Sequence, residues 1–214
     1  MSIDLVLPVA ALLGLVLGLA ADRLAARWPE HEPGVARRGL DWRTAVLALN
    51  GGLVFAALVV RWPDPWHLLV LAPYAAALIV LLATDLDQRL LPDVITLPLI
   101  VYAAVVLLAG WSPLLAGKEA ALFSGLAAGI GAPVLLFVSD RALHGALGQG
   151  DLKLAVSVGF LSGLSRLFGG FLVASVAFAV VLLVLIAVRR IGLRTAIPFG
   201  PVIIGAAFVA MLSG

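Results

Sequence analysis

The chain has 214 residues, of which 63% are hydrophobic and only 12% are charged. About a quarter of the residues of a soluble domain are charged, and a soluble fold of this length could not hide so much apolar surface. This composition excludes an ordinary soluble protein. The lack of cysteine excludes disulfides and thiolate metal sites. The net charge is only +2, and no run of basic residues is interleaved with aromatic ones, which argues against nucleic acid as a partner.

Charges, prolines and glycine pairs divide the apolar sequence into segments that approach the roughly 20 residues needed to cross a bilayer as a helix. We expect an all-α fold, a polytopic transmembrane helical bundle of about eight spans, forming one membrane-embedded domain over residues 1–214. The predicted spans are Ile3–Leu24, Ala45–Val60, His67–Thr84, Val94–Leu108, Glu119–Val138, Lys153–Leu164, Leu167–Val188 and Ala196–Leu212. Ser165-Arg166 separates the short sixth span from the seventh.

The distribution of lysine and arginine predicts the orientation of these spans. With the N-terminus outside, eleven of the fourteen basic residues fall on the cytoplasmic side. Both termini are then outside, and the loops after odd-numbered spans face the cytoplasm. One of these is a short irregular loop at about residues 25–44, which contains Pro29, Pro33 and Gly34.

Two predicted cytoplasmic segments place carboxylates beside apolar runs. They read TDLDQRLLPDVITLP from Thr84 to Pro98, and HGALGQGDLKLA from His144 to Ala155. Asp85 directly follows an apolar run, so it is expected on the last turn of a helix. Asp151 follows Gly148-Gln149-Gly150 and precedes an apolar run, so it is expected at a helix start, where exposed N–H groups favour a carboxylate.

Other charges of the first segment, Asp87 and Arg89, are by themselves typical of a solvated loop. Asp85 and Asp151 differ because an ionisable group at the membrane edge is by default a candidate for function. Two carboxylates on one membrane face can share a proton, one activating water and the other polarising a carbonyl. Ion-coupled transporters use such carboxylates as well, so peptide hydrolysis and ion transport both remain open at this point.

At these residues the sequence resembles the type IV prepilin peptidase family, the GxGD-type aspartyl proteases of the bacterial inner membrane. One family pattern is present as Asp85, Arg89 and Leu91-Pro92-Asp93 followed by VITLP, and the second, G-x-G-D-x-K-L, as Gly148 to Leu154. The segment IPFGP, from Ile197 to Pro201, is similar to a further family segment.

The resemblance implies that Asp85 and Asp151 are the catalytic pair of a hydrolase that needs no metal or cofactor. The supporting or substrate-binding residues would be Asp93, Lys153, Gly148, Gly150, Arg89 and Pro92. It also implies a multi-pass inner-membrane protein, embedded in lipid, that cleaves the leader of a prepilin or pseudopilin helix at the cytoplasmic face. Because larger members carry paired cysteines in a cytoplasmic domain that this chain lacks, N-methyltransferase activity with S-adenosylmethionine is not expected.

Two alternatives remain. The chain could be a small proton- or cation-coupled transporter component that uses both aspartates, or a non-catalytic pilus or secretion assembly factor that only holds pilin-like helices. The glycine-rich stretch Gly125–Pro133 predicts close helix packing within the chain and could equally support a homodimer.

Overall fold

The computed structural model describes residues 3–28, 39–115, 120–143, 147–188 and 199–213. Within these ranges the chain is helical, in the order α1 (Ile3–Ala25), α2 (Trp42–Arg61), α3 (Pro65–Gln88), α4 (Asp93–Leu108), α5 (Ala121–Leu143), α6 (Gln149–Ala187) and α7 (Gly200–Leu212). Five of these helices, all but α4 and α7, are long and apolar enough to cross a membrane. In the described ranges the chain is therefore an all-helical, polytopic membrane protein, as expected because a helix satisfies most of its backbone hydrogen bonds internally.

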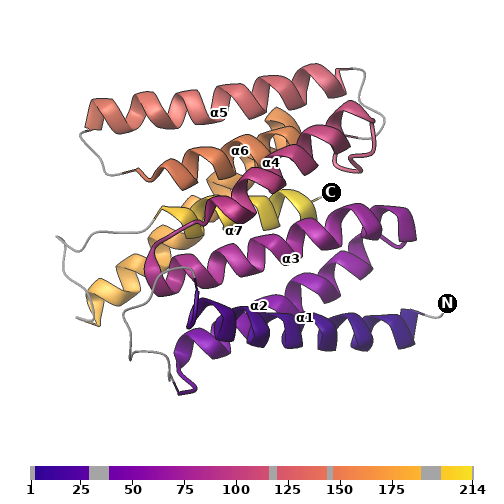
Figure 1. Cartoon of the computed structure of the whole chain (residues 1–214), viewed down its shortest axis with the longest axis vertical. Coiled ribbons are helices and arrows are strands. Elements are labelled where there is room, and N and C mark those ends of the chain that lie inside the picture. The colour runs from indigo at the N-terminus through magenta and orange to yellow at the C-terminus, as the bar shows by residue number, and fades with distance from the viewer. Residues whose placement is uncertain (1–2, 29–38, 116–119, 144–146, 189–198, 214) are drawn as a thin grey trace.

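The helices run roughly side by side, with α1 and α2 along one side of the bundle, α5 along the other, and α3 and α7 between them (Figure 1). The C-terminal end of α3 and the N-terminal ends of α4, α6 and α7 lie at one end of the bundle, called the carboxylate end below because it carries Asp85 and Asp151. The N-terminal end of α1 and the C-terminal end of α7 lie at the opposite end (Figure 1).

Most helix boundaries agree with the predicted spans to within a few residues, because charges and prolines end the apolar runs. One difference matters for the site. Helix α3 continues beyond Thr84 to Gln88, so Asp87 lies in a helix and its assignment to a solvated loop is wrong. Of the predicted loop at 25–44, residues 29–38 lie outside the described parts of the chain.

The sixth and seventh predicted spans both fall within α6, which has 39 residues. A straight helix of that length would measure about 58 Å, roughly twice the hydrocarbon thickness. The helix is instead broken at Gly163, where φ is 68° and ψ is 177°, a conformation that side chains strongly disfavour. The break lies two residues before Ser165. The count of eight spans remains a prediction, since the described residues form seven helices.

Side-chain hydroxyl groups form hydrogen bonds with the backbone groups of α6 at this break. The amide of Leu164 donates to the Ser124 hydroxyl of α5 at 3.0 Å, and the Ser112 hydroxyl donates to the Leu161 carbonyl at 2.6 Å. In lipid, where no water can replace a lost helical bond, such side-chain partners allow a helix to bend. The bend is thus held by the elements that pack around it.

Helix α6 also packs closely on α5. A methyl group added at Gly159 would lie 2.5 Å from the backbone carbon of Ala128, so only glycine permits this approach. Ala128 belongs to the glycine-rich stretch, so the predicted close packing within the chain is confirmed. The homodimer stays a prediction.

Candidate active site

Asp85 lies on the last turn of α3, as its place after an apolar run predicts, and is only 4% exposed. Its Oδ2 atom is buried and accepts no hydrogen bond from the described residues. The backbone of Gly200, at the start of α7, lies against the carboxyl group, since a Cβ there would come within 2.8 Å of the Asp85 Cγ. The carboxyl group is therefore held against the backbone of a second helix.

Arg89 closes the helix that carries Asp85. Its φ of 55° is left-handed, a common conformation for the residue that ends a helix, and its N–H donates to the Asp85 carbonyl at 2.9 Å. The Arg89 side chain is exposed but close enough for its positive charge to act on the Asp85 carboxyl group. Arg89 thus contacts Asp85 both through the backbone and through charge.

Asp151 is the third residue of α6, as predicted, and is 8% exposed. Its Oδ2 accepts a hydrogen bond from the Gly148 N–H at 3.2 Å, so the side chain caps the helix that contains it. The carboxyl groups of Asp151 and Asp85 are close enough to interact electrostatically. The structure therefore brings together two mostly buried carboxylates from different helices at the carboxylate end of the bundle.

Gly150 allows the two aspartate segments to approach. A Cβ at this position would lie 2.7 Å from the Leu91 Cβ and 3.2 Å from the Leu91 carbonyl oxygen. Leu91 belongs to the connection between α3 and α4, so a side chain at residue 150 would push the first turn of α6 away from it. Gly148 differs, because it is exposed and contacts mainly the Asp151 side chain.

Pro92 begins α4 beside this contact, and an ion pair between Asp93 and Lys153 joins α4 to α6. The Pro92 carbonyl accepts the N–H groups of Ile95 and Thr96, both at 3.0 Å, and so begins α4. Asp93, the first residue of α4, is exposed, and its Oδ1 accepts a bond from the Lys153 Nζ at 2.6 Å. All eight residues that the sequence singles out therefore lie at this end of the bundle.

We expect the Lys153–Asp93 ion pair to add little to stability. Lys153→Gln, Asp93→Asn and the double variant should each lower the free energy of unfolding by less than about 1 kcal/mol, because water screens an exposed pair. Reversible unfolding in detergent micelles, followed by circular dichroism, measures this quantity. A loss of several kcal/mol in either single variant would contradict this expectation. A small loss would mean that any large fall in activity is not caused by unfolding.

Two kinds of contact at this site are not predicted by the sequence. No local pattern singles out Gly200 as a site residue, although it lies in the IPFGP segment, of which residues 197–198 are outside the described parts. The ion pair between Asp87 and Arg43 of α2 joins residues that are 44 positions apart, so no local sequence pattern predicts it. Within the described ranges, no three His, Asp or Glu side chains are grouped so that they could hold a metal ion.

Comparison with known proteins places these observations in a family. Residues 72–184 match the model of the type IV leader peptidase family. The chain is 32% identical over 194 residues to a prepilin leader peptidase/N-methyltransferase of Pseudomonas putida. This match covers 90% of this chain and 61% of that protein. A protein of the same name from Dickeya chrysanthemi is 32% identical over 165 residues, which cover 76% of this chain and 56% of that protein. Another, from Bacillus subtilis, is 29% identical over 161 residues, which cover 75% of this chain and 62% of that protein.

The chain thus spans about three fifths of the length of these curated relatives. No solved structure matches it. The family match covers more than half of the chain and includes both Asp85 and Asp151. This protein therefore belongs to the type IV leader peptidase family.

Proposed function

We propose that the chain is an aspartyl endopeptidase that cleaves the leader of type IV prepilin or pseudopilin-like substrates at the cytoplasmic face of the bacterial inner membrane. The observation that carries this proposal is the meeting of Asp85 and Asp151, from α3 and α6, at one end of an apolar helical bundle. Paired carboxylates in a partly dry site can divide the roles of acid and base between them. Family membership supports the same reaction. The peptidase domain would extend over residues 1–214.

In the proposed reaction one carboxylate takes a proton from a water molecule, and the water oxygen bonds to the scissile carbonyl carbon. The other carboxyl group, protonated at the start, donates its proton to the carbonyl oxygen. When the C–N bond breaks, the leaving nitrogen takes up a proton, so the products are a leader carboxyl group and a new amino terminus. Gly148, Gly150, Arg89 and Pro92 would shape the two turns that hold the carboxylates, and the Lys153–Asp93 pair would join them. No metal or cofactor is needed.

An apolar surface beside the aspartates suits a substrate that is itself a membrane helix. Helices α5, α6 and α7 line an apolar hollow, to which Ala155 and Ile203 contribute. Ala155 lies one turn after Asp151, and Ile203 lies one turn after Gly200. A hydrophobic helix along this surface would present its N-terminal end at the two carboxylates. The bond to be cut would have to leave the helical conformation, because a hydrogen-bonded helix shields its carbonyl groups.

The orientation proposed for the chain places both termini outside and the aspartates at the cytoplasmic face. It rests on the asymmetry of lysine and arginine between predicted loops. The positions of the chain's first and last helical ends, opposite the carboxylate end (Figure 1), are compatible with it. We also propose that the chain acts as a peptidase only, since it has none of the cysteines that the family resemblance links to N-methylation.

Processing of a prepilin in cells tests this proposal. The chain and a prepilin from the same genome are produced together in a bacterium without its own prepilin peptidase, and the pilin mass is measured. We expect loss of the leader and a new N-terminus without a methyl group. A precursor that stays whole would contradict the proposal. In that case, ion flux that depends on both aspartates would indicate a transporter, and pilus assembly retained by Asp85→Asn and Asp151→Asn would indicate an assembly factor.

A further inference from the structure

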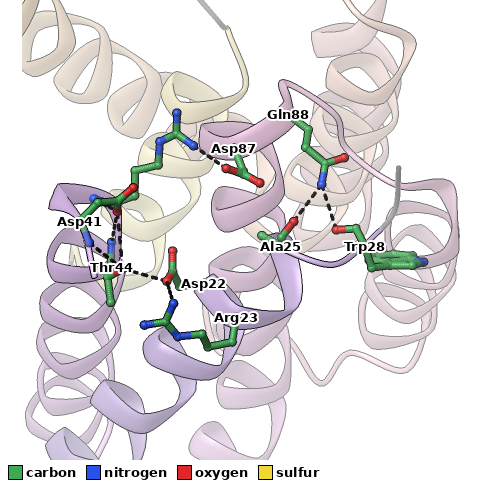
Figure 2. A network of polar contacts seen from close by, with 9 residues as sticks. Asp22, Arg23, Ala25, Trp28, Asp41, Thr44, Asp87 and Gln88 are labelled. Atoms are coloured by element: carbon green, nitrogen blue, oxygen red, sulfur yellow. Dashed lines mark hydrogen bonds and ion pairs between the residues drawn. The ribbon is translucent and has the colours of Figure 1, made fainter. Parts of the chain in front are cut away.

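A network of polar contacts joins α1, α2 and α3 at the carboxylate end of the bundle (Figure 2). Gln88, the last residue of α3, donates its side-chain amide to the Ala25 carbonyl at 2.8 Å and to the Trp28 carbonyl at 3.1 Å. The final carbonyl groups of a helix have no partner within it, so the bond to Ala25 satisfies the last carbonyl of α1, and the bond to Trp28 holds the turn that follows it. They also tie the last turn of α3 to that end.

Helix α2 holds the same turn of α3 through an ion pair. The Arg43 guanidinium donates to the Asp87 carboxylate, whose side chain is only 10% exposed. The start of α2 is itself fixed, because Asp41 accepts the N–H groups of Arg43 at 2.9 Å and of Thr44 at 3.2 Å. Arg43 therefore projects from a capped helix start, where backbone motion is restricted.

A buried carboxylate fixes α2 against α1 at the same level. Asp22 of α1 is fully buried and accepts the Thr44 hydroxyl at 2.8 Å, with the Arg23 guanidinium 3.8 Å away. Figure 2 shows the side chains of Asp22 and Thr44 facing each other, and Asp87 on α3 with its own contact. Helices α1 and α2 thus form a joined support, and α3 is attached to it through Asp87 and Gln88.

The position of Asp87 on α3 explains what this support could do. Two residues of α-helix turn the chain by about 200°, so Asp85 and Asp87 point to opposite sides of α3. Asp85 lies against α7 and near Asp151, whereas Asp87 lies against α2. The last turn of a helix frays readily unless other groups hold it. Contacts behind the helix therefore limit the movement of the carboxyl group in front of it.

We propose that Arg43 and Asp87 are positioning residues. They hold the last turn of α3 so that the Asp85 carboxyl group keeps its position relative to the Asp151 carboxyl group. This inference rests on the proposed peptidase function. Neither residue touches the reacting groups in this role. Their pairing matters because a partly buried ion pair between helices contributes little net stability but restricts the geometry that the two helices can adopt.

Steady-state cleavage of a prepilin by the purified chain in lipid nanodiscs tests this role. Arg43→Gln and Asp87→Asn should each lower kcat about ten- to hundredfold, because small displacements of a catalytic group are costly, and should leave KM unchanged. The charge-exchanged double variant, Arg43→Asp with Asp87→Arg, should recover part of the loss, and Arg43→Lys should lose less than Arg43→Gln. Asp64→Asn is the matched control, because Asp64 is an exposed carboxylate at the other end of α3. It should keep the wild-type kcat.

A second measurement needs no cleavage. The chain has no cysteine, so spin labels can be attached to Leu90→Cys and Gln149→Cys, two exposed positions that follow Asp85 and precede Asp151. Arg43→Gln should broaden the distance distribution between the labels, and the charge exchange should narrow it again. The positioning role is overturned if the single variants keep the wild-type kcat, or if Arg43→Gln leaves the distribution of distances between the two labels unchanged. If the wild-type chain cleaves no prepilin, the proposed function fails, and the spin-label result alone decides whether Arg43 and Asp87 hold the turn.

Discussion

Asp85→Asn and Asp151→Asn are each expected to lower the rate of prepilin cleavage by about a thousandfold or more, since each removes one partner of the acid–base pair. Asparagine keeps the size of the side chain and much of its hydrogen bonding, but it cannot take up or deliver the proton. The double variant should be no slower than the single variants, because the two carboxylates act as one unit. Purified protein in nanodiscs and a discontinuous gel assay suffice for the measurement.

The control for this pair is again Asp64→Asn, which makes the same chemical change at the far end of α3. All the variants must enter the membrane and keep the helical circular dichroism of the wild-type chain. Under those conditions, cleavage at more than a tenth of the wild-type rate by either Asp85→Asn or Asp151→Asn would eliminate that residue from the catalytic pair.

Gly200→Ala is expected to lower kcat about tenfold or more without removing any functional group. Its Cβ would lie 2.8 Å from both the Cγ and Oδ2 atoms of Asp85, so the carboxyl group or the start of α7 must move. Since the Asp85 side chain is buried, it has little space into which to move. The measured quantity is the ratio of kcat to that of the wild-type chain at saturating prepilin.

Gly205→Ala provides the matched control on the same helix. A Cβ there would meet only the Cβ of Ala174, at an ordinary 3.4 Å, so activity should stay close to that of the wild type. Equal activity of the Gly200 and Gly205 variants would show that the backbone of α7 does not set the position of the Asp85 carboxyl group.

Much of the fold is predictable from the sequence because in lipid the chain alternates between apolar spans and charged connections. The same local logic predicts that Asp85 ends a helix and that Asp151 begins one, and the structure confirms both placements. A local pattern is enough here, since helix ends are set by the residues that flank them. The charges after Thr84 predict too early an end for α3, because Asp87 is paired with Arg43 and stays helical.

Contacts between distant segments could not be predicted in this way. Arg43 counts toward the basic residues that predict orientation, and nothing near it in the sequence indicates that it faces Asp87. Likewise, Gly163 is one of 22 glycines, and only the packing of Ser124 and Ser112 around it distinguishes it as the point where α6 breaks. Such positions depend on how helices pack against one another, which a hydrophobic pattern does not specify.

The most direct test of the central claim is the cleavage of a purified prepilin by the purified chain in nanodiscs made up in ¹⁸O-labelled water, analysed by mass spectrometry. We predict that the leader and the mature pilin appear together, that their masses sum to the precursor plus one water, and that the new leader carboxyl group contains one ¹⁸O atom. We also predict that neither product forms with Asp85→Asn or Asp151→Asn. An intact precursor with the wild-type chain, or equal cleavage with both variants, would contradict hydrolysis by these two aspartates.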